Sequence, residues 1–478
     1  MERKSGILMH ISSLWGEYSC GSFGKQCIEF VDFLKSCGFS YWQVLPFCLP
    51  DFCNSPYSSF SAFSVNPNFI DLESLNMEKL ITDEELATAV QESPYRCEFT
   101  RLRKERFDLL SKAASRFKDT DKIDEFMSNH PHTANFCKFM AIKINNDGKA
   151  FWEWDNETPD EKTENTWRFI CYIFFKQWLS IKQYANSKGV LIIGDIPMYV
   201  SQDSSDVWES PESFLLNEQR RPLCVAGVPP DYFSLDGQLW GNPIYDWKHM
   251  EEDNFKWWRE RVGFMCELFD GIRIDHFRGF STYYTCPPDA KNARIGQWNV
   301  GPRMKIVNAI KEAAKDKILI AEDLGTLSDD VQELVEASGF PSMKVVQFAN
   351  PDDPDNHHLP HNFNHNCVAY TGTHDNNTLL GNIWDLDESF RWRYLAYFGY
   401  EGSNWNCKES YYSVIRSVLA CVADTVIFPI QDILLYGSDT RMNIPGKEDG
   451  NWEFRIKKSQ LNSIDINKLK FYNKIYGR

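Results

Sequence analysis

The chain has 478 residues, of which 43% are hydrophobic and 25% are charged, and its formal net charge is -16. This composition is typical of a folded globular protein with a large core. The negative charge argues against nucleic acid and anionic membranes as partners, because both bind basic surfaces. No apolar run has the length of a signal-peptide core or a membrane span, and the 14 cysteines include no Cys-x-x-Cys pair. We therefore expect a cytoplasmic protein with reduced thiols.

Eight short apolar segments that end in polar residues predict β-strands, at 6–14, 41–47, 190–198, 271–277, 318–324, 343–349, 367–375 and 426–434. Helical patterns alternate with them, at 25–36, 255–268, 303–314, 329–337, 390–398 and 413–422. This alternation predicts a parallel (β/α)8 TIM barrel, in the α/β class, with residues 1–478 forming one catalytic domain. An open doubly wound sheet is the alternative, but no predicted strand leads into a Gly-x-Gly-x-x-Gly turn.

Two intervals are too long to be simple connections. The first, 50–188, has helical patterns at 83–92, 102–118, 134–144 and 167–185, which predict a mainly helical insertion. The second, 201–247, is rich in Pro, Gly and aromatic residues and is expected to be mostly irregular. Both leave from the carboxyl-terminal ends of strands, where barrel enzymes build their sites, so we expect them to wall a cleft.

The segment 270–280 places charged residues in a strand that is otherwise apolar. Ile272 and Ile274 alternate with Arg273 and Asp275, so the two charged side chains point to the same face of the strand. An arginine beside a carboxylate favours the ionised form, which a nucleophilic aspartate needs. An ordinary ion pair at a strand end explains this segment equally well when the segment is taken alone.

Three further predicted strands also end in acids, which are Asp195, Glu322, Asp323 and Asp375. In a barrel these strand ends meet on one rim. Two carboxyl groups on either side of a glycosidic bond perform retaining glycoside chemistry, one as nucleophile and the other as acid. A metal site is the competing interpretation of an acid cluster. We expect no metal, because Arg273 would repel a cation at the centre of the cluster.

Several longer strings are distinctive: Gly6-Ile-Leu-Met-His10, Tyr41-Trp-Gln-Val-Leu-Pro46, Ser55-Pro-Tyr57, Ala226-Gly-Val-Pro-Pro-Asp-Tyr-Phe233, Gly237-Gln-Leu-Trp-Gly-Asn-Pro243, Arg441-Met-Asn443 and Gly450-Asn-Trp452. The acid-bearing strand ends, in their order, resemble the four signature regions of the α-amylase clan. Together with the longer strings they resemble the amylomaltase family, which is glycoside hydrolase family 77 and comprises bacterial 4-α-glucanotransferases and plant disproportionating enzymes. The resemblance extends over nearly the whole chain.

The resemblance implies roles for three acids. Carried over position by position, Asp275 is the nucleophile, Glu322 is the general acid and base, and Asp375 is a carboxylate that stabilises the transition state. Strand periodicity alone does not choose between Glu322 and Asp323, because neighbours on a strand face opposite ways.

The resemblance also implies residues that bind substrate or support the catalytic acids. Arg273 holds Asp275 ionised, and His374 binds hydroxyls of the donor sugar. Asp195 orients the strand of the nucleophile, with capping of the next loop as its alternative. Tyr57 lines the cleft, with packing within its loop as its alternative.

The interval 201–247 corresponds in the resemblance to a loop that covers the bound glucan. Trp240 and Asn242 are expected to contact sugar there, by stacking and by hydrogen bonding respectively. Such a cover keeps water from the glycosyl-enzyme while one sugar leaves and another arrives.

The implied activity is 4-α-glucan transfer, by double displacement with retention and without a cofactor. The expected ligands are malto-oligosaccharides and α-1,4-glucans, with glucose among the acceptors, and we expect a monomer or a homodimer. A hydrolase of the same clan is one alternative, against which the strings between residues 226 and 243 argue. A non-catalytic glucan-binding protein is the other, but such a protein should have lost one of its catalytic acids.

Overall fold

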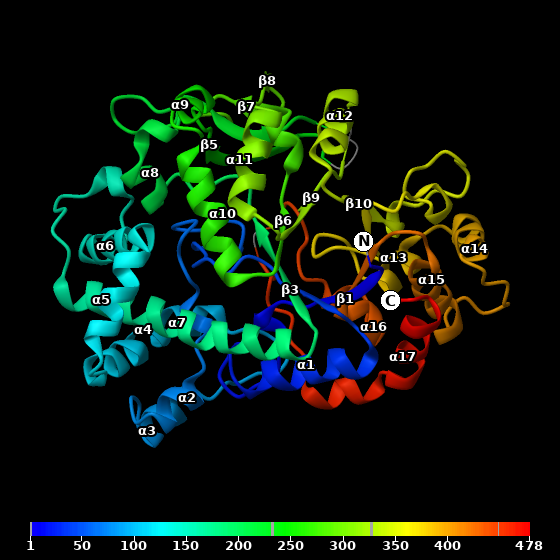
Figure 1. Ribbon diagram of the computed structural model, residues 1–478, viewed down its shortest axis with the longest axis horizontal. Coiled ribbons are helices and arrows are strands. Elements are labelled where there is room, and N and C mark those ends of the chain that lie inside the picture. Colours follow the sequence, from blue (N-terminus) through cyan, green and yellow to red (C-terminus); the bar gives the residue numbers. More distant parts are fainter. Residues whose placement is uncertain (1, 231–233, 326–327, 448) are drawn as a thin grey trace.

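The centre of the molecule is a barrel of parallel strands. Figure 1 shows the computed structural model, which describes residues 2–230, 234–325, 328–447 and 449–478. Eight strands pair in parallel in the order β10-β11-β12-β1-β2-β3-β6-β9. Their bounds are β1 (Lys4–Leu8), β2 (Tyr41–Gln43), β3 (Leu191–Ile196), β6 (Gly271–Ile274), β9 (Ile318–Ala321), β10 (Ser342–Val345), β11 (Cys367–Tyr370) and β12 (Thr425–Pro429). The predicted (β/α)8 barrel is confirmed.

The ladder of backbone hydrogen bonds is interrupted between β9 and β10. Beyond the end of β9, the buried carboxylate of Asp323 accepts a hydrogen bond from the backbone N–H of Met343 at 2.7 Å. One backbone bond also crosses this gap, from Ala321 N to Pro341 O at 3.0 Å. Asp323 therefore takes the place of a backbone carbonyl where the barrel closes.

Helices lie around the outside of the barrel (Figure 1), among them α1 (Lys25–Cys37), α7 (Glu161–Ser187), α10 (Lys256–Leu268), α11 (Met304–Ala314), α12 (Asp329–Ser338), α15 (Lys408–Ala420) and α17 (Ile466–Ile475), with α14 (Glu388–Tyr397) beside α15. Buried residues recur along α1 with helical spacing. Gly38 follows the last residue of α1, and its φ of 83° suits a residue without a side chain. All six helices predicted between the strands are present, each within a few residues of the expected bounds.

The interval 50–188 is mainly helical, with α2 (Leu72–Met77), α3 (Asp83–Thr88), α4 (Phe99–Arg116), α5 (Thr120–Asn129) and α6 (Pro131–Asn145) before α7. Asp160 caps the amino-terminal end of helix α7, where its carboxylate accepts from Thr163 N at 2.9 Å. It contacts α4 and α6 within the interval, and also β3, α1 and α10 of the barrel. This long helix therefore joins the inserted helices to the barrel wall.

A second, antiparallel sheet was not predicted from the sequence. It has the order β5-β4-β7-β8, with β4 (Val225–Val228), β5 (Gln238–Pro243), β7 (Thr282–Cys286) and β8 (Gln297–Val300). Two of its strands come from the interval 201–247, which also contains α8 (Ser205–Glu209). Residues 231–233, at the end of the Ala226 to Phe233 string, lie outside the described residues. The second sheet adds a wall beside the carboxyl ends of β3 and β6.

The remaining elements are short and lie in connections: α9 (Trp247–Glu252), α13 (Leu379–Asp385), α16 (Ile430–Leu434) and the 3-10 helices η1 (Ile11–Ser13), η2 (Pro67–Phe69), η3 (Phe151–Glu153), η4 (Pro211–Ser213), η5 (Phe277–Phe280), η6 (Val346–Phe348), η7 (Pro360–Asn362), η8 (Ser438–Thr440) and η9 (Lys458–Ser463). Several of the predicted strands are shorter than expected, because their last residues turn into these connections. The predicted strand 6–14, for example, ends at Leu8 and continues into η1.

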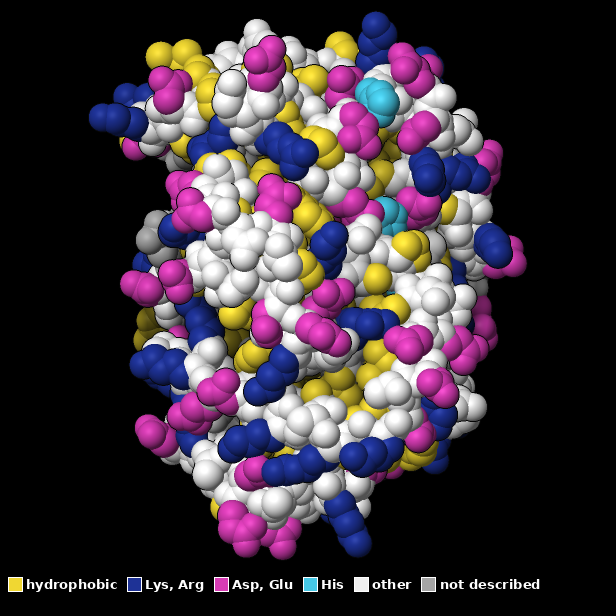
Figure 2. Space-filling view, turned by 90° about the vertical axis from the view of Figure 1, so that its left-hand side faces the viewer, with side chains coloured by type: hydrophobic (Ala, Val, Ile, Leu, Met, Phe, Trp, Pro, Cys, Tyr) yellow, Lys and Arg dark blue, Asp and Glu magenta, His cyan; other side chains and the backbone are white. Residues whose placement is uncertain are grey.

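The surface over the inserted helices carries charges of both signs. Figure 2 shows Lys and Arg side chains interspersed with Asp and Glu on this face, so it presents no extended basic area. No helix within the described ranges has both the length and the apolar character needed to cross a lipid bilayer. All 14 cysteines lie in described segments and carry free thiols.

A histidine joins the inserted helices to the barrel. His132, at the start of α6, has Nδ1 3.3 Å from Glu209 Oε2 and Nε2 2.8 Å from Glu260 Oε2. Its ring stacks on Phe63 with centroids 4.2 Å apart. Carboxylates only accept hydrogen bonds, so both contacts require a doubly protonated ring. Burial lowers the pKa of His132, but the two carboxylates outweigh it and raise the pKa to about 9.

This arrangement predicts a loss of stability at alkaline pH. Because the pKa of folded His132 lies above the unfolded value, its stabilisation is fully present below pH 6.5 and disappears as the pH rises through about 9. We expect His132→Gln to lower the free energy of unfolding by about 2 kcal/mol at pH 6 and by much less at pH 10. Thermal melting from pH 6 to pH 10 measures the difference. His365→Gln is the control, because the His365 side chain is 75% exposed. If the difference in melting temperature between wild type and His132→Gln does not change with pH, the prediction is contradicted.

Candidate active site

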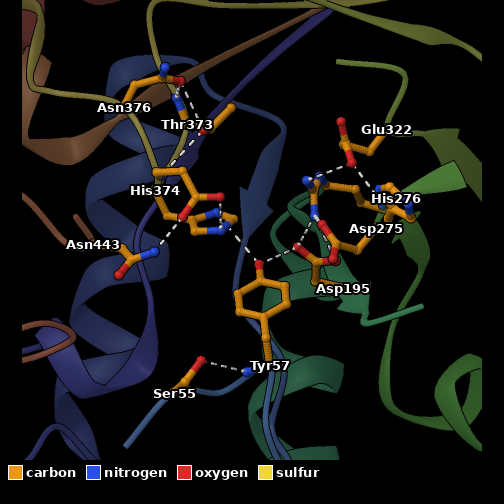
Figure 3. A network of polar contacts seen from close by, with 12 residues as sticks. Ser55, Tyr57, Asp195, Asp275, His276, Glu322, Thr373, His374, Asn376 and Asn443 are labelled. Atoms are coloured by element: carbon orange, nitrogen blue, oxygen red, sulfur yellow. Dashed lines mark hydrogen bonds and ion pairs between the residues drawn. The ribbon is translucent and has the colours of Figure 1, made fainter. Parts of the chain in front are cut away.

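The predicted acids meet at the carboxyl ends of the barrel strands (Figure 3). Asp195 lies in β3, whereas Asp275 and Glu322 follow directly after β6 and β9. Asp375 lies in the connection between β11 and α13. The expectation that these strand ends share one rim is confirmed. Of the four carboxyl groups, Asp275, Glu322 and Asp375 line one cavity of about 580 Å³, and Asp195 is buried behind it.

Arg273 links three of these acids. Its Nη1 lies 3.0 and 2.8 Å from the two carboxylate oxygens of Asp195, and 2.9 Å from Asp275 Oδ1. Its Nη2 lies 3.9 Å from Glu322 Oε2. Burial raises the pKa of Asp195 to about 6, and the adjacent guanidinium keeps this carboxyl ionised at neutral pH. The predicted shared face of Arg273 and Asp275 is confirmed, and the guanidinium stabilises negative charge on Asp275.

Two backbone N–H groups hold the carboxylate of Glu322. His276 N donates to Oε2 at 2.7 Å, and Leu324 N donates to Oε1 at 2.7 Å. His276 has a φ of 48°, an unusual left-handed conformation for a residue with a side chain. Burial raises the pKa of Glu322 to about 7, with Arg273 opposing the rise and Asp275 adding to it. Glu322 can therefore both give and take a proton at neutral pH.

Asp375 has a different environment from Glu322. Its side chain is 46% exposed, His374 Nε2 lies 3.2 Å from Oδ2, and Asn443 Nδ2 donates to Oδ1 at 2.6 Å. Arg441 Nη2 donates to the backbone carbonyl of Asp375 at 2.8 Å. Desolvation raises the pKa of Asp375, but His374 and the hydrogen bond from Asn443 outweigh it, so the pKa lies well below its usual range. This carboxylate is ionised while Glu322 exchanges its proton.

Tyr57 connects the two sides of the cavity. Its hydroxyl donates to Asp195 Oδ2 at 2.8 Å, and its ring stacks on that of His374, with centroids 4.9 Å apart and planes at 16°. Burial lowers the pKa of His374, but Asp375 outweighs it and the net shift is upward. Asp195, Tyr57 and His374 thus form a continuous chain of contacts (Figure 3). The ion pair of His374 with Asp375 extends this chain to the other side of the cavity.

The second sheet supplies another wall. Trp240 lies in β5, is 37% exposed, and meets the ring of His276 edge-on with centroids 4.8 Å apart. Asn242, also in β5, lines the same cavity, but its Nδ2 donates to Val200 O at 2.8 Å. This bond uses one N–H of the Asn242 amide, so the second N–H and the carbonyl oxygen can still bind a sugar.

Several cavity residues had no assigned role before the structure. His276 positions the carboxylate of Glu322, Asn443 holds Asp375, and the ring of Trp452 has its centroid 5.9 Å from that of His374. Asn443 and Trp452 lie in strings that identified the family resemblance, which was the only signal for them. Their distance in sequence from the strand ends hid their place in the site.

The site shows no preorganised metal cage. In residues 2–230, 234–325, 328–447 and 449–478, no group of three or more His, Cys, Asp or Glu side chains is placed to hold a metal ion. The positive charge at the centre of the acids comes from Arg273.

Comparisons with known proteins agree with this geometry. A family model described as 4-alpha-glucanotransferase matches residues 9–461. The 4-alpha-glucanotransferase of Clostridium butyricum is 41% identical over 98% of this chain and 100% of the relative. The chloroplastic/amyloplastic 4-alpha-glucanotransferase of Solanum tuberosum is 38% identical over 100% of this chain and 86% of the relative. Amylomaltase from Streptococcus agalactiae, solved in complex with acarbose, is 36% identical with a TM-score of 0.94, covering 100% of this chain and 99% of that chain.

Each of these matches spans nearly the whole chain and includes the barrel strands that carry the acids. The fold, the clustered carboxyl groups and the sequence similarity agree. This chain belongs to the 4-alpha-glucanotransferase family.

Proposed function

We propose that this protein transfers segments of α-1,4-glucan from a donor malto-oligosaccharide to the 4-hydroxyl of an acceptor sugar, through a covalent glycosyl-enzyme. One observation carries the proposal. Glu322, whose pKa is raised, and Asp375, whose pKa is lowered, line the same cavity as Asp275. The carboxylate of Asp275 contacts Arg273. When the environments of carboxyl groups in one site differ, their pKa values differ, and one group can act as an acid while another stays ionised.

In the first step, Glu322 donates its proton to the glycosidic oxygen while Asp275 attacks the anomeric carbon. The bond from the anomeric carbon to the leaving oxygen breaks as the bond to the Asp275 carboxylate forms. Arg273 stabilises the attacking carboxylate, and Asp375 stabilises the positive charge that develops on the sugar ring. The part of the donor that carried the glycosidic oxygen then leaves, and its new 4-hydroxyl keeps the proton that Glu322 donated.

In the second step, Glu322 acts as the base. Its carboxylate takes the proton from the acceptor 4-hydroxyl, and the resulting oxygen nucleophile attacks the anomeric carbon. The bond to Asp275 breaks, and the α-linkage forms again with retained configuration. Because the pKa of Glu322 is about 7, this residue changes between its protonated and its ionised form without a large free-energy cost.

The other cavity residues are proposed to bind the glucan. His374 donates to sugar hydroxyls, and Tyr57 and Asp195 keep His374 and Arg273 in place. Trp240 stacks on a sugar ring, and the amide oxygen of Asn242 accepts from a sugar hydroxyl. In this proposal the interval 201–247 covers the substrate, which favours a sugar acceptor over water.

The natural donors and acceptors are proposed to be malto-oligosaccharides and glucose. No cofactor is needed, since both steps use protein carboxyl groups alone. We propose that the protein is cytoplasmic, which its free thiols support. We also propose that it is a monomer or a homodimer.

Incubation with maltotriose, alone and with labelled glucose, tests the proposal. Transfer gives a ladder of longer oligomers, free glucose, and label that enters the ladder, with a constant number of reducing ends. Conversion to glucose and maltose with a matching rise in reducing ends would mean that water is the acceptor and would refute transfer.

A further inference from the structure

A buried carboxylate outside the cavity holds the connection that carries two proposed substrate contacts. Asp432 lies in α16, directly after β12, and is 1% exposed. Its Oδ2 accepts from the hydroxyl of Thr371 at 2.5 Å, and its Oδ1 accepts from the backbone N–H of Leu379 at 2.7 Å. Both carboxylate oxygens are therefore used by one short stretch of chain.

These two partners mark the ends of that stretch. Thr371 is the first residue after β11, and Leu379 is the first residue of α13. His374 and Asp375 lie between them. One carboxylate thus fixes both ends of the connection that carries His374 and Asp375, at a distance from the reacting atoms.

The centre of the connection is held by its own hydrogen bonds. Asn376 Oδ1 accepts from both the backbone N–H and the hydroxyl of Thr373 at 2.9 Å. This internal turn makes the connection a compact unit whose position depends on where its ends are held. A small cavity of about 30 Å³ lies beneath it, bordered by Asp432, His10, His374 and Arg441.

Burial of the Asp432 carboxyl group lowers the stability of the fold, and a residue that only filled space would not need a carboxyl group. Burial raises its pKa to about 6, opposed only by the hydrogen bonds from Leu379 and Thr371, with no nearby cation among the described groups that act on it. A buried carboxyl group without a cation lowers stability unless its hydrogen bonds compensate. Both of those bonds go to the ends of the connection between β11 and α13.

We propose that Asp432 is a positioning residue for glucan transfer: by binding Thr371 and Leu379 it fixes the connection that presents His374 and Asp375 to the bound sugar. The inference rests on the proposed function, because it concerns the placement of groups that act in that reaction. A shift of about 1 Å in such a group lowers the rate by about 100-fold.

The test compares Asp432→Ala with Asp432→Asn. In the alanine variant both hydrogen bonds are lost, and we expect kcat for maltotriose disproportionation to fall about 100-fold while KM changes less than about threefold. In the asparagine variant the amide oxygen still accepts from Leu379 N, and the amide N–H can donate to the Thr371 hydroxyl. We expect kcat to recover to within about fivefold of wild type.

Thr371→Val is a second variant, for the case in which Asp432→Ala does not fold. It removes one of the two hydrogen bonds and keeps the side-chain shape, so we expect a fall in kcat of about tenfold in a folded protein. Asp71→Ala is the matched control. Asp71 is 4% exposed and accepts from Ser74 N at 2.9 Å at the start of α2, away from the connection.

We expect Asp71→Ala and Asp432→Ala to lower the melting temperature similarly, and only Asp432→Ala to lower kcat. Wild-type kcat in Asp432→Ala, or in Thr371→Val if the alanine variant is unfolded, would overturn the inference. An equal loss of kcat in the Asp71 control, or no recovery in Asp432→Asn, would also overturn it. A wild-type protein that hydrolyses maltotriose without transfer would instead refute the proposed function, so the two failures are distinguished.

Discussion

Asp275→Asn is expected to lower transfer activity by about 10,000-fold or more, because loss of a nucleophile removes the covalent route. The amide keeps the size of the carboxylate, and Arg273 still has Asp195 as a partner, so we expect the fold to persist. The measurement is mass spectrometry after reaction with an α-maltosyl fluoride donor. Wild type should gain one glycosyl group on Asp275, and the variant should gain none.

Asp270→Asn is the control for this experiment. Asp270 lies at the opposite end of the same strand, where its Oδ2 accepts from Ile192 N at 2.9 Å. The amino-terminal face of a barrel contributes to stability rather than chemistry, so we expect activity within a fewfold of wild type. An adduct on another residue of Asp275→Asn would show that the nucleophile is misassigned.

Glu322→Gln should have the second largest effect. We expect transfer from maltotriose to fall by about 1,000-fold, in the range found for loss of a general acid. Fluoride leaves without protonation, so an α-maltosyl fluoride donor should still react with Asp275. The glycosyl-enzyme should then accumulate, because no base activates the acceptor. Equal losses with maltotriose and with the fluoride donor would refute the assignment.

The pH dependence gives an independent check on the same residue. The first step needs protonated Glu322, whose pKa is about 7. We therefore expect kcat/KM for maltotriose to fall as the pH rises above about 7. The fall should be absent when Glu322→Gln reacts with the fluoride donor.

The sequence predicted the barrel because its strands are buried on both faces and therefore appear as continuous apolar runs. The strand ends were less well predicted, since residues such as those after Leu8 and Tyr370 are apolar or small but leave the ladder. The second sheet was not predicted because its central pairing, β4 with β7, joins segments about 60 residues apart, and because β8 is largely exposed. Pairing between distant, half-exposed segments leaves little periodic signal in either segment.

The site was predictable where it lies on strands and less so where it lies on connections. The alternation of Ile272, Arg273, Ile274 and Asp275 fixed the shared face of the charged pair. The contacts of Asn443 with Asp375, and of Asn242 with Val200, depend on how long connections fold back. Local sequence patterns do not encode such contacts, so only the family resemblance pointed to these segments.

The place of β1 in the barrel has a consequence for synthesis on the ribosome. Lys4 in β1 pairs with Thr425 in β12, so at roughly 5 to 20 residues per second the first strand waits on the order of 20 to 80 s for its partner. During that time one edge of β1 is unpaired and open to other chains or to chaperones. Closure is therefore a late event, and a nascent chain released before residue 425 has an open sheet edge instead of a smaller barrel.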